Sequence, residues 1–156
     1  MKGGESVKKV LLVLLAFLFI STAAADSCYV LCQPDSFVNV REFPRMGAQV
    51  AGYAELGVSL ETDWTRRNGF VKVYGFEAGE AWIYAGFVTE HPVTVETVNG
   101  RIESTGRVAC RRYINGTRRQ WLKNGTEVVI YARSEDWSIT NKGFIKTQFL
   151  GVFSGE

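Results

Sequence analysis

Short runs of alternating apolar and polar residues recur along the chain and are separated by glycine, asparagine and charged residues. An alternation with a period of two places apolar side chains on one face of a β-strand. The pattern predicts a strand that begins at Phe37 and further strands over residues 58–61, 70–74, 81–84, 128–131, 137–140 and 144–146. Aromatic residues make up 13% of the sequence, which together with this pattern favours an all-β protein over a helical bundle.

The chain contains an internal repeat whose two copies run in the same order. Residues 38–41 match 108–111, residues 56–58 match 124–126, and residues 69–73 match 136–140; the copies then close alike, with 81–83 against 143–145 and 86–88 against 148–150. The length differences fall between the predicted strands, chiefly over 74–80, where loops tolerate insertions. The repeat predicts two tandem small β-barrels.

The repeat also predicts the domain boundaries. We expect an N-terminal segment over 26–35, a first barrel over 36–90, a connecting hairpin over 91–104 and a second barrel over 105–156. The hairpin is predicted because Asn99-Gly100 can adopt the positive φ angles of a two-residue turn.

Residues 1–25 have the pattern of a secretory signal peptide. Three lysines precede an apolar run over 10–20, and small residues follow over 21–25. Eleven apolar residues at about 1.5 Å each cover only about half of a ~30 Å bilayer core, so cleavage is favoured over a membrane anchor. The sequence therefore predicts a secreted protein, extracellular or associated with the cell wall and without a membrane segment after cleavage.

Charge is distributed unevenly in the expected mature chain. Residues 26–92 carry five basic and nine acidic side chains, whereas residues 93–156 carry ten basic and six acidic ones. The two halves cancel, so nucleic acid is an unfavourable partner for the whole chain, while the basic half could meet an anionic polymer.

Several ordered motifs occur twice. An opening Val-Asn-Val-Arg over 38–41, a glycine-bounded segment over 52–57, Gly69-Phe70 and a closing Ala81-Trp82-Ile83 have counterparts over 108–111 and 120–125, at Asp136-Trp137 and over 143–145. This set resembles the bacterial Src-homology-3-like (SH3-like, SH3b) domain across about 36–90 and 105–152. The resemblance implies two SH3-like barrels that bind bacterial cell-wall peptidoglycan or an extracellular peptide. The alternative is a structural adaptor that binds a protein and no wall ligand.

The most specific binding hypothesis concerns the arginines over 111–119. If Asn115-Gly116 forms a two-residue turn, Arg112 faces Arg119 and Tyr113 faces Arg118 across a hairpin. Like charges in such pairs cost about 0.2–1 kcal/mol unless an anion lies between them, and guanidinium groups bind carboxylate or phosphate well. The sequence thus suggests an anion-binding hairpin, with a solvated basic loop as the other interpretation.

Aromatic residues near predicted loops or on alternate strand faces are candidates for a binding groove, with packing roles as the alternative. They are Tyr53, Trp64, Tyr74, Phe76 and Tyr84 in the first copy and Tyr113 and Trp121 in the second.

No catalytic or cofactor site is expected. The single histidine, His91, precedes a proline between the repeats and has no nucleophile motif beside it. Among the three cysteines, Cys110 matches Val40 and should be buried, whereas the pairing of Cys28, Cys32 and Cys110 stays open. A zinc site made from these residues and His91 would lack the usual ligand spacing. We therefore expect a non-enzymatic protein without a metal or cofactor.

Overall fold

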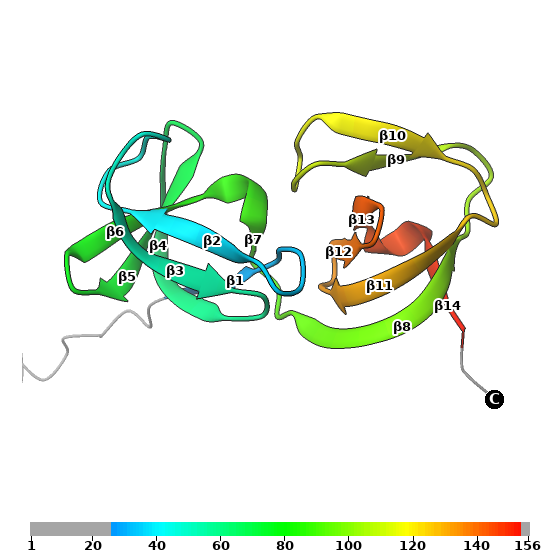
Figure 1. The fold of residues 1–156 in the computed structure, drawn as a ribbon, viewed down its shortest axis with the longest axis horizontal. Helices are drawn as coiled ribbons and strands as arrows, with labels where there is room; N and C mark the ends of the chain where they lie inside the picture. Colours follow the sequence, from blue (N-terminus) through cyan, green and yellow to red (C-terminus); the bar gives the residue numbers. More distant parts are fainter. Residues whose placement is uncertain (1–25, 154–156) are drawn as a thin grey trace, which may run out of the picture.

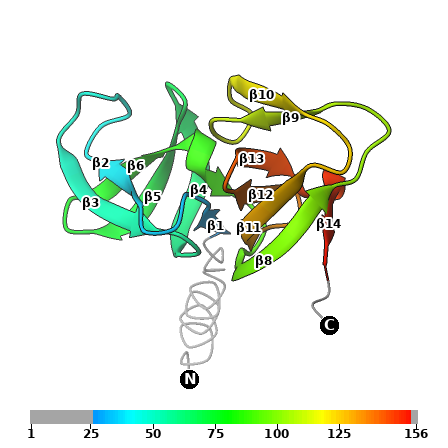
Figure 2. The ribbon, with the colours of Figure 1, turned by 45° about the vertical axis from the view of Figure 1, so that its right-hand side comes forward.

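The computed structural model describes residues 26–153, so the predicted signal peptide over 1–25 lies outside the described residues. The described chain is all-β and forms two seven-stranded antiparallel sheets that lie side by side (Figures 1 and 2). The prediction of an all-β fold with two tandem barrels is confirmed. In the described part of the chain, no helix has the length and apolar character needed to cross a membrane.

The first sheet contains the first copy of the repeat and one strand, β1, from the segment before it. Its strands are β1 (Asp26–Val30), β2 (Phe37–Arg41), β3 (Val50–Glu55), β4 (Ser59–Arg67), β5 (Phe70–Phe76), β6 (Gly79–Tyr84) and β7 (Val88–Thr89), with the 3-10 helix η1 (Ala85–Phe87) before β7. The spatial order is β3-β2-β6-β5-β4-β1-β7.

The second sheet repeats this plan. Its strands are β8 (Thr94–Ile102), β9 (Val108–Arg111), β10 (Arg118–Leu122), β11 (Glu127–Arg133), β12 (Trp137–Thr140), β13 (Gly143–Lys146) and β14 (Leu150–Val152), with η2 (Thr147–Phe149) before β14. The order β10-β9-β13-β12-β11-β8-β14 equals that of the first sheet when each strand is shifted by seven. The sequence repeat is therefore a repeat of topology.

Two segments outside the predicted barrels belong to the sheets. The segment over 26–35 contributes β1, which pairs with both β4 and β7. The expected connecting hairpin over 91–104 is wrong, because β8 runs unbroken through Asn99 and Gly100 and pairs with β11 and β14. Gly100 is not in a turn but allows β14 to approach β8 closely. A Cβ at this position would lie 2.7 Å from the carbonyl oxygen of Gly151.

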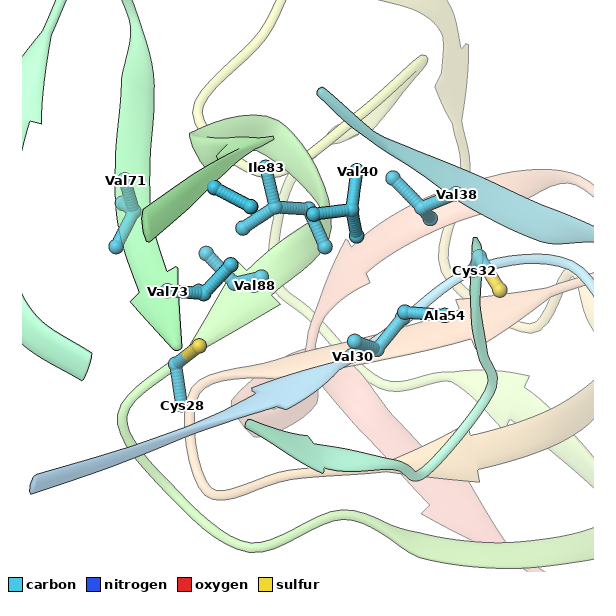
Figure 3. Packing of buried hydrophobic residues seen from close by; sticks show 11 residues of the cluster. Cys28, Val30, Cys32, Val38, Val40, Ala54, Val71, Val73, Ile83 and Val88 are labelled. Atoms are coloured by element: carbon cyan, nitrogen blue, oxygen red, sulfur yellow. The ribbon is translucent and has the colours of Figure 1, made fainter. Parts of the chain in front are cut away.

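Each barrel has its own apolar core. Figure 3 shows the first, where β-branched residues such as Val40, Val71 and Ile83 pack with Cys28 and Cys32. The second core contains Cys110 at the position of Val40, together with Ile130 and Ile145. The predicted burial of Cys110 is confirmed, because its side chain is fully inaccessible.

A third apolar cluster joins the barrels. Leu31, which follows β1, is fully buried among residues of the second barrel that include Trp137, Ile139 and Phe144. Phe87 of η1 packs against the same cluster. The two sheets are therefore docked through apolar contacts, and this docking positions the candidate site.

Candidate functional site

The loop between β9 and β10 packs against the first barrel. The amide of Ile114 donates a hydrogen bond to the carbonyl oxygen of Gly86 at 2.8 Å, and the Ile114 side chain is only 7% exposed. Figures 1 and 2 show this loop reaching from the second barrel toward the first. An apolar residue at the loop tip thus holds the arginines on either side of it at the boundary between the barrels.

The turn in this loop is shifted from the predicted one. The amide of Gly116 bonds to the carbonyl oxygen of Tyr113 at 2.9 Å, and Asn115 has a φ of 54°. The turn is therefore centred on Ile114 and Asn115, and the expected pairing of Arg112 with Arg119 is wrong. In the observed register Arg118 pairs with Arg111. The observed turn places Ile114 against the first barrel, where its side chain is buried and its amide bonds to Gly86. This contact favours the shifted turn over one at Asn115-Gly116.

Tyr84 and Tyr113 lie at the interface between the barrels. Their rings meet edge to face with centroids 5.4 Å apart, and Phe87 lies 6.4 Å from Tyr113. A Cβ on Gly86 would lie 2.8 Å from the Tyr113 ring, so the absent side chain makes room for this contact. The interaction with Tyr113 and, secondarily, burial raise the pKa of Tyr84. These two tyrosines pack the interface and do not line the cleft described next.

A cleft of about 460 Å³ opens where the barrels meet. It is lined by Cys32, Gln33, Ser36, Phe37, Val38 and Phe87 from the first barrel and by Arg111, Arg112, Arg119, Gly143 and Phe144 from the second. The rings of Phe87 and Phe144, 6.1 Å apart, connect the cleft to the apolar cluster between the barrels. The structure thus brings Arg112 and Arg119 to one cavity, although not through the predicted pairing.

Three of the lining residues are arginines and none is acidic. Nη1 of Arg111 donates to the carbonyl oxygen of Gly116 at 2.7 Å, and Nη1 of Arg119 makes a longer contact of 3.4 Å with the carbonyl oxygen of Lys142. Within residues 26–153, the guanidinium of Arg112 has no hydrogen-bond partner or ion pair, and it is exposed. The cleft therefore offers guanidinium donors to an anion.

The wall contributed by the first barrel is aromatic. Phe37 is 58% exposed and meets Tyr53 edge to face with ring centroids 4.6 Å apart. Tyr53 is itself exposed and lies beyond the cleft lining. A ligand anchored at the arginines could extend over an apolar surface that begins at Phe37 and continues to Tyr53.

The other predicted site residues lie elsewhere. The guanidinium of Arg118 stacks over the Trp121 ring at 4.6 Å, on β10 and outside the cleft lining. The Tyr74 hydroxyl donates to Asp63 at 2.7 Å on the first barrel. Partial desolvation opposes ionisation of Asp63, but hydrogen bonds from Lys72, the Thr65 amide and Tyr74 prevail and hold its pKa well below the usual range.

Sequence reasoning missed most of the cleft lining. Arg111 belongs to the predicted basic stretch over 111–119 but is not among the predicted site residues, and Phe37 is predicted only as a strand residue. A usable signal was the position of Phe37 directly before the buried Val38, because alternation places it on the outer strand face. Gln33 and Ser36 had no comparable signal, since they join the site through docking of the barrels.

His91 ties the connection between the barrels to the β11–β12 turn. Its Nδ1 lies 3.2 Å from a carboxylate oxygen of Glu135, and its Nε2 lies 3.4 Å from one of Asp136. In the part of the chain that the structure describes, no cluster of three or more His, Cys, Asp or Glu residues is arranged to hold a metal ion.

The three cysteines are free and buried. Burial raises the pKa of Cys28 to about 11; burial, with a smaller effect of Glu55, raises that of Cys32 to about 11. Because the thiolate is the reactive form, we expect Ellman's reagent at pH 8 to leave all three unmodified in the folded protein and to modify all three in urea. Stoichiometric modification of the folded protein within minutes would contradict this prediction.

Comparisons with known proteins leave the family open. No protein-family profile matches the chain, and no curated protein matches it. Among solved structures, NlpC1 from Trichomonas vaginalis is 15% identical with a TM-score of 0.36, over 83% of this chain and 46% of that one. NlpC2 from the same organism is 14% identical with a TM-score of 0.35, over 84% and 49%. The chain thus spans about half the length of these proteins, and likeness at this level identifies neither a family nor an activity for it.

Proposed function

We propose that the chain is a secreted, non-catalytic binding protein that holds an anionic group of a cell-wall or peptide ligand in the cleft between its barrels. The observation that carries the proposal is the lining of the cleft, which has three arginines and no acidic residue. Cell-wall peptidoglycan contains peptide stems with carboxylates, and guanidinium groups bind carboxylates through paired hydrogen bonds. Peptidoglycan is therefore the preferred ligand class, with an extracellular peptide as the other.

The two sides of the cleft supply different parts of the recognition. Arg112 and Arg119 are exposed, so their guanidinium groups can turn toward a carboxylate. Phe37 and Val38 provide apolar surface on the opposite side. A ligand that carries a carboxylate beside an apolar or sugar face uses both sides, whereas a bare anion uses only the arginines.

The test is co-sedimentation of residues 26–156 with peptidoglycan sacculi. Replacing Arg112 and Arg119 with serine is expected to weaken binding at least tenfold, because a hydrogen bond to a charged group contributes about 1.5–3 kcal/mol. Binding of the unmodified protein should also fall between low and high salt, because exposed charges are screened. The supernatant is assayed for released muropeptides, and their release would contradict a non-catalytic role.

The matched control is Arg101→Ser with Arg118→Ser. This variant loses the same charge, but its arginines stack on Phe153 and Trp121, outside the cleft. It should keep most of the binding. Equal losses in the two variants would indicate a general charge effect, and no binding by the unmodified protein would favour the protein-adaptor alternative.

A further inference from the structure

The β2–β3 loop of the first barrel is equivalent to the docked β9–β10 loop, but within residues 26–153 it takes no part in the apolar cluster between the barrels. With the repeat offset of 70 residues, Phe43 and Pro44 of the β2–β3 loop correspond to Tyr113 and Ile114. In the second barrel these positions pack against the first barrel. In the first barrel, Pro44 is buried, but Phe43 is 58% exposed and Met46 farther along the loop is 68% exposed. Figures 1 and 2 show this loop at the end of the first barrel away from the second.

The exposed loop borders a shaped cavity. A pocket of about 360 Å³ is lined by Phe43, Pro44, Arg45, Arg67 and Asn68. Nδ2 of Asn68, from the turn between β4 and β5, donates to the carbonyl oxygen of Pro44 at 3.2 Å and ties the two loops together. The pocket is thus held between two connected loops and has room for one bulky side chain.

The two charged residues that line this pocket are both basic, although they lie in an otherwise acidic half of the chain. Arg45 and Arg67 line it, and neither makes an ion pair among residues 26–153. Arg66, the neighbour of Arg67, stacks over the Trp64 ring at 5.7 Å. Exposed arginines around an apolar pocket are complementary to a partner with carboxylates beside an apolar side chain.

A second copy of this chain does not offer the surface that receives such a loop. Within one chain that surface is centred on Gly86 and is covered by Tyr113 of the same chain. Its counterpart on the second barrel has Gln148 in place of Gly86 and Lys146 in place of Tyr84. A side chain at position 148 obstructs the approach that glycine permits, and Lys146 repels the arginines of the loop. Docking of the loop onto the equivalent surface of a second copy is therefore disfavoured.

We infer that the pocket between the β2–β3 loop and the β4–β5 turn docks an acidic segment of another protein. A bulky apolar side chain of that segment enters between Phe43 and Asn68, and flanking carboxylates bind Arg45 and Arg67. The concave shape and the paired loops favour a peptide segment over a flat lipid surface. This surface is separate from the cleft between the barrels.

The test uses defined peptides and backbone amide chemical shifts of residues 26–156. The probe is a blocked pentapeptide, Glu-Asp-Phe-Asp-Glu, and its controls are Glu-Asp-Gly-Asp-Glu and Lys-Lys-Phe-Lys-Lys. We expect the probe to shift amides over 42–49 and 65–69 and to bind at least tenfold more tightly than either control. Equal binding of the probe and the glycine peptide, or of the probe and the basic peptide, would overturn the inference.

Variants identify the surface. Phe43→Ser with Met46→Ser changes two exposed side chains and should weaken probe binding at least tenfold, whereas Tyr53→Ser, also exposed, should not. The Arg112→Ser and Arg119→Ser variant should bind the probe normally, so the inference can fail or hold independently of the cleft. Probe-induced shifts confined to 111–119 would overturn it. So would Phe43-dependent binding to phosphatidylglycerol vesicles without peptide binding, which would indicate a membrane surface.

Discussion

Replacing Gly143 with alanine is expected to lower the free energy of unfolding by about 3 kcal/mol or more, because backbone strain and overpacking add at this position. Gly143 has a φ of 132°, a conformation that residues with a Cβ rarely adopt. A Cβ there would lie 2.6 Å from the carbonyl oxygen of Arg111 and 2.9 Å from Sγ of Cys110. Neither atom is the end of a long flexible side chain, so β9 and β13 would have to separate.

The tight hairpin between β12 and β13 explains the requirement. Thr140 pairs with Gly143 across two turn residues, and the Thr140 hydroxyl donates to the carbonyl oxygen of Gly143 at 2.9 Å. In the first copy the equivalent position is Ala81, which is fully buried and does not have a positive φ. The first copy tolerates a Cβ because its longer β5–β6 hairpin turns farther out, between Phe76 and Gly79.

Urea unfolding followed by circular dichroism measures the effect, with Gly79→Ala as the control. Gly79 also has a positive φ, 77°, but no atom lies within 4 Å of its Cβ position. The Gly79→Ala variant should therefore lose only about 1–2 kcal/mol of unfolding free energy, which the strained backbone costs. If the two variants lose equal stability, contact with Arg111 and Cys110 does not contribute. Because Gly143 also lines the cleft, its replacement should weaken sacculus binding in the same preparation.

The repeat made the sequence informative about the fold. Strands predicted from alternation, such as β5 and β12, appear in the structure, and equal sheet orders follow from the two copies. Asparagine–glycine pairs were less reliable. Asn99-Gly100 lies inside β8, whereas Asn68-Gly69, which was not singled out, forms the two-residue turn with positive φ at both positions. Local turn propensity was overridden where Gly100 was needed for the close approach of β14 to β8.

The candidate site was less predictable because it depends on how the barrels dock. The basic stretch and its predicted turn identified Arg112, Arg118 and Arg119. Arg112 and Arg119 line the cleft, whereas Arg118 lies outside it and the predicted turn is wrong. Tyr113 followed from the same stretch, but the structure places it against Tyr84 in the interface. The pattern of apolar and polar residues within one copy does not indicate which face of that barrel will contact the other barrel. Residues such as Gln33 therefore become part of the site only in the docked arrangement.

Leu31→Ala is expected to lower the free energy of unfolding by about 2–5 kcal/mol, the range for truncating a buried leucine. Leu31 is fully buried, and its amide bonds to the carbonyl oxygen of Phe87 at 2.8 Å. Although it follows a strand of the first barrel, its cluster partners include Trp137 and Ile139 of the second. We therefore expect faster hydrogen exchange in β12 and β13, far along the sequence from the substitution, as measured by mass spectrometry.

The control for this effect is Leu60→Ala, which makes the same chemical change on a side chain packed against the core of the first barrel. It should leave exchange in β12 and β13 nearly unchanged under conditions where both variants stay folded. Unaltered exchange in Leu31→Ala would show that the barrels are not energetically coupled. Coupling matters for the cleft because Phe87 and Phe144, one from each barrel, contribute both to its lining and to the cluster around Leu31. Leu31→Ala should consequently weaken binding at Arg112 and Arg119 without altering any side chain that lines the cleft.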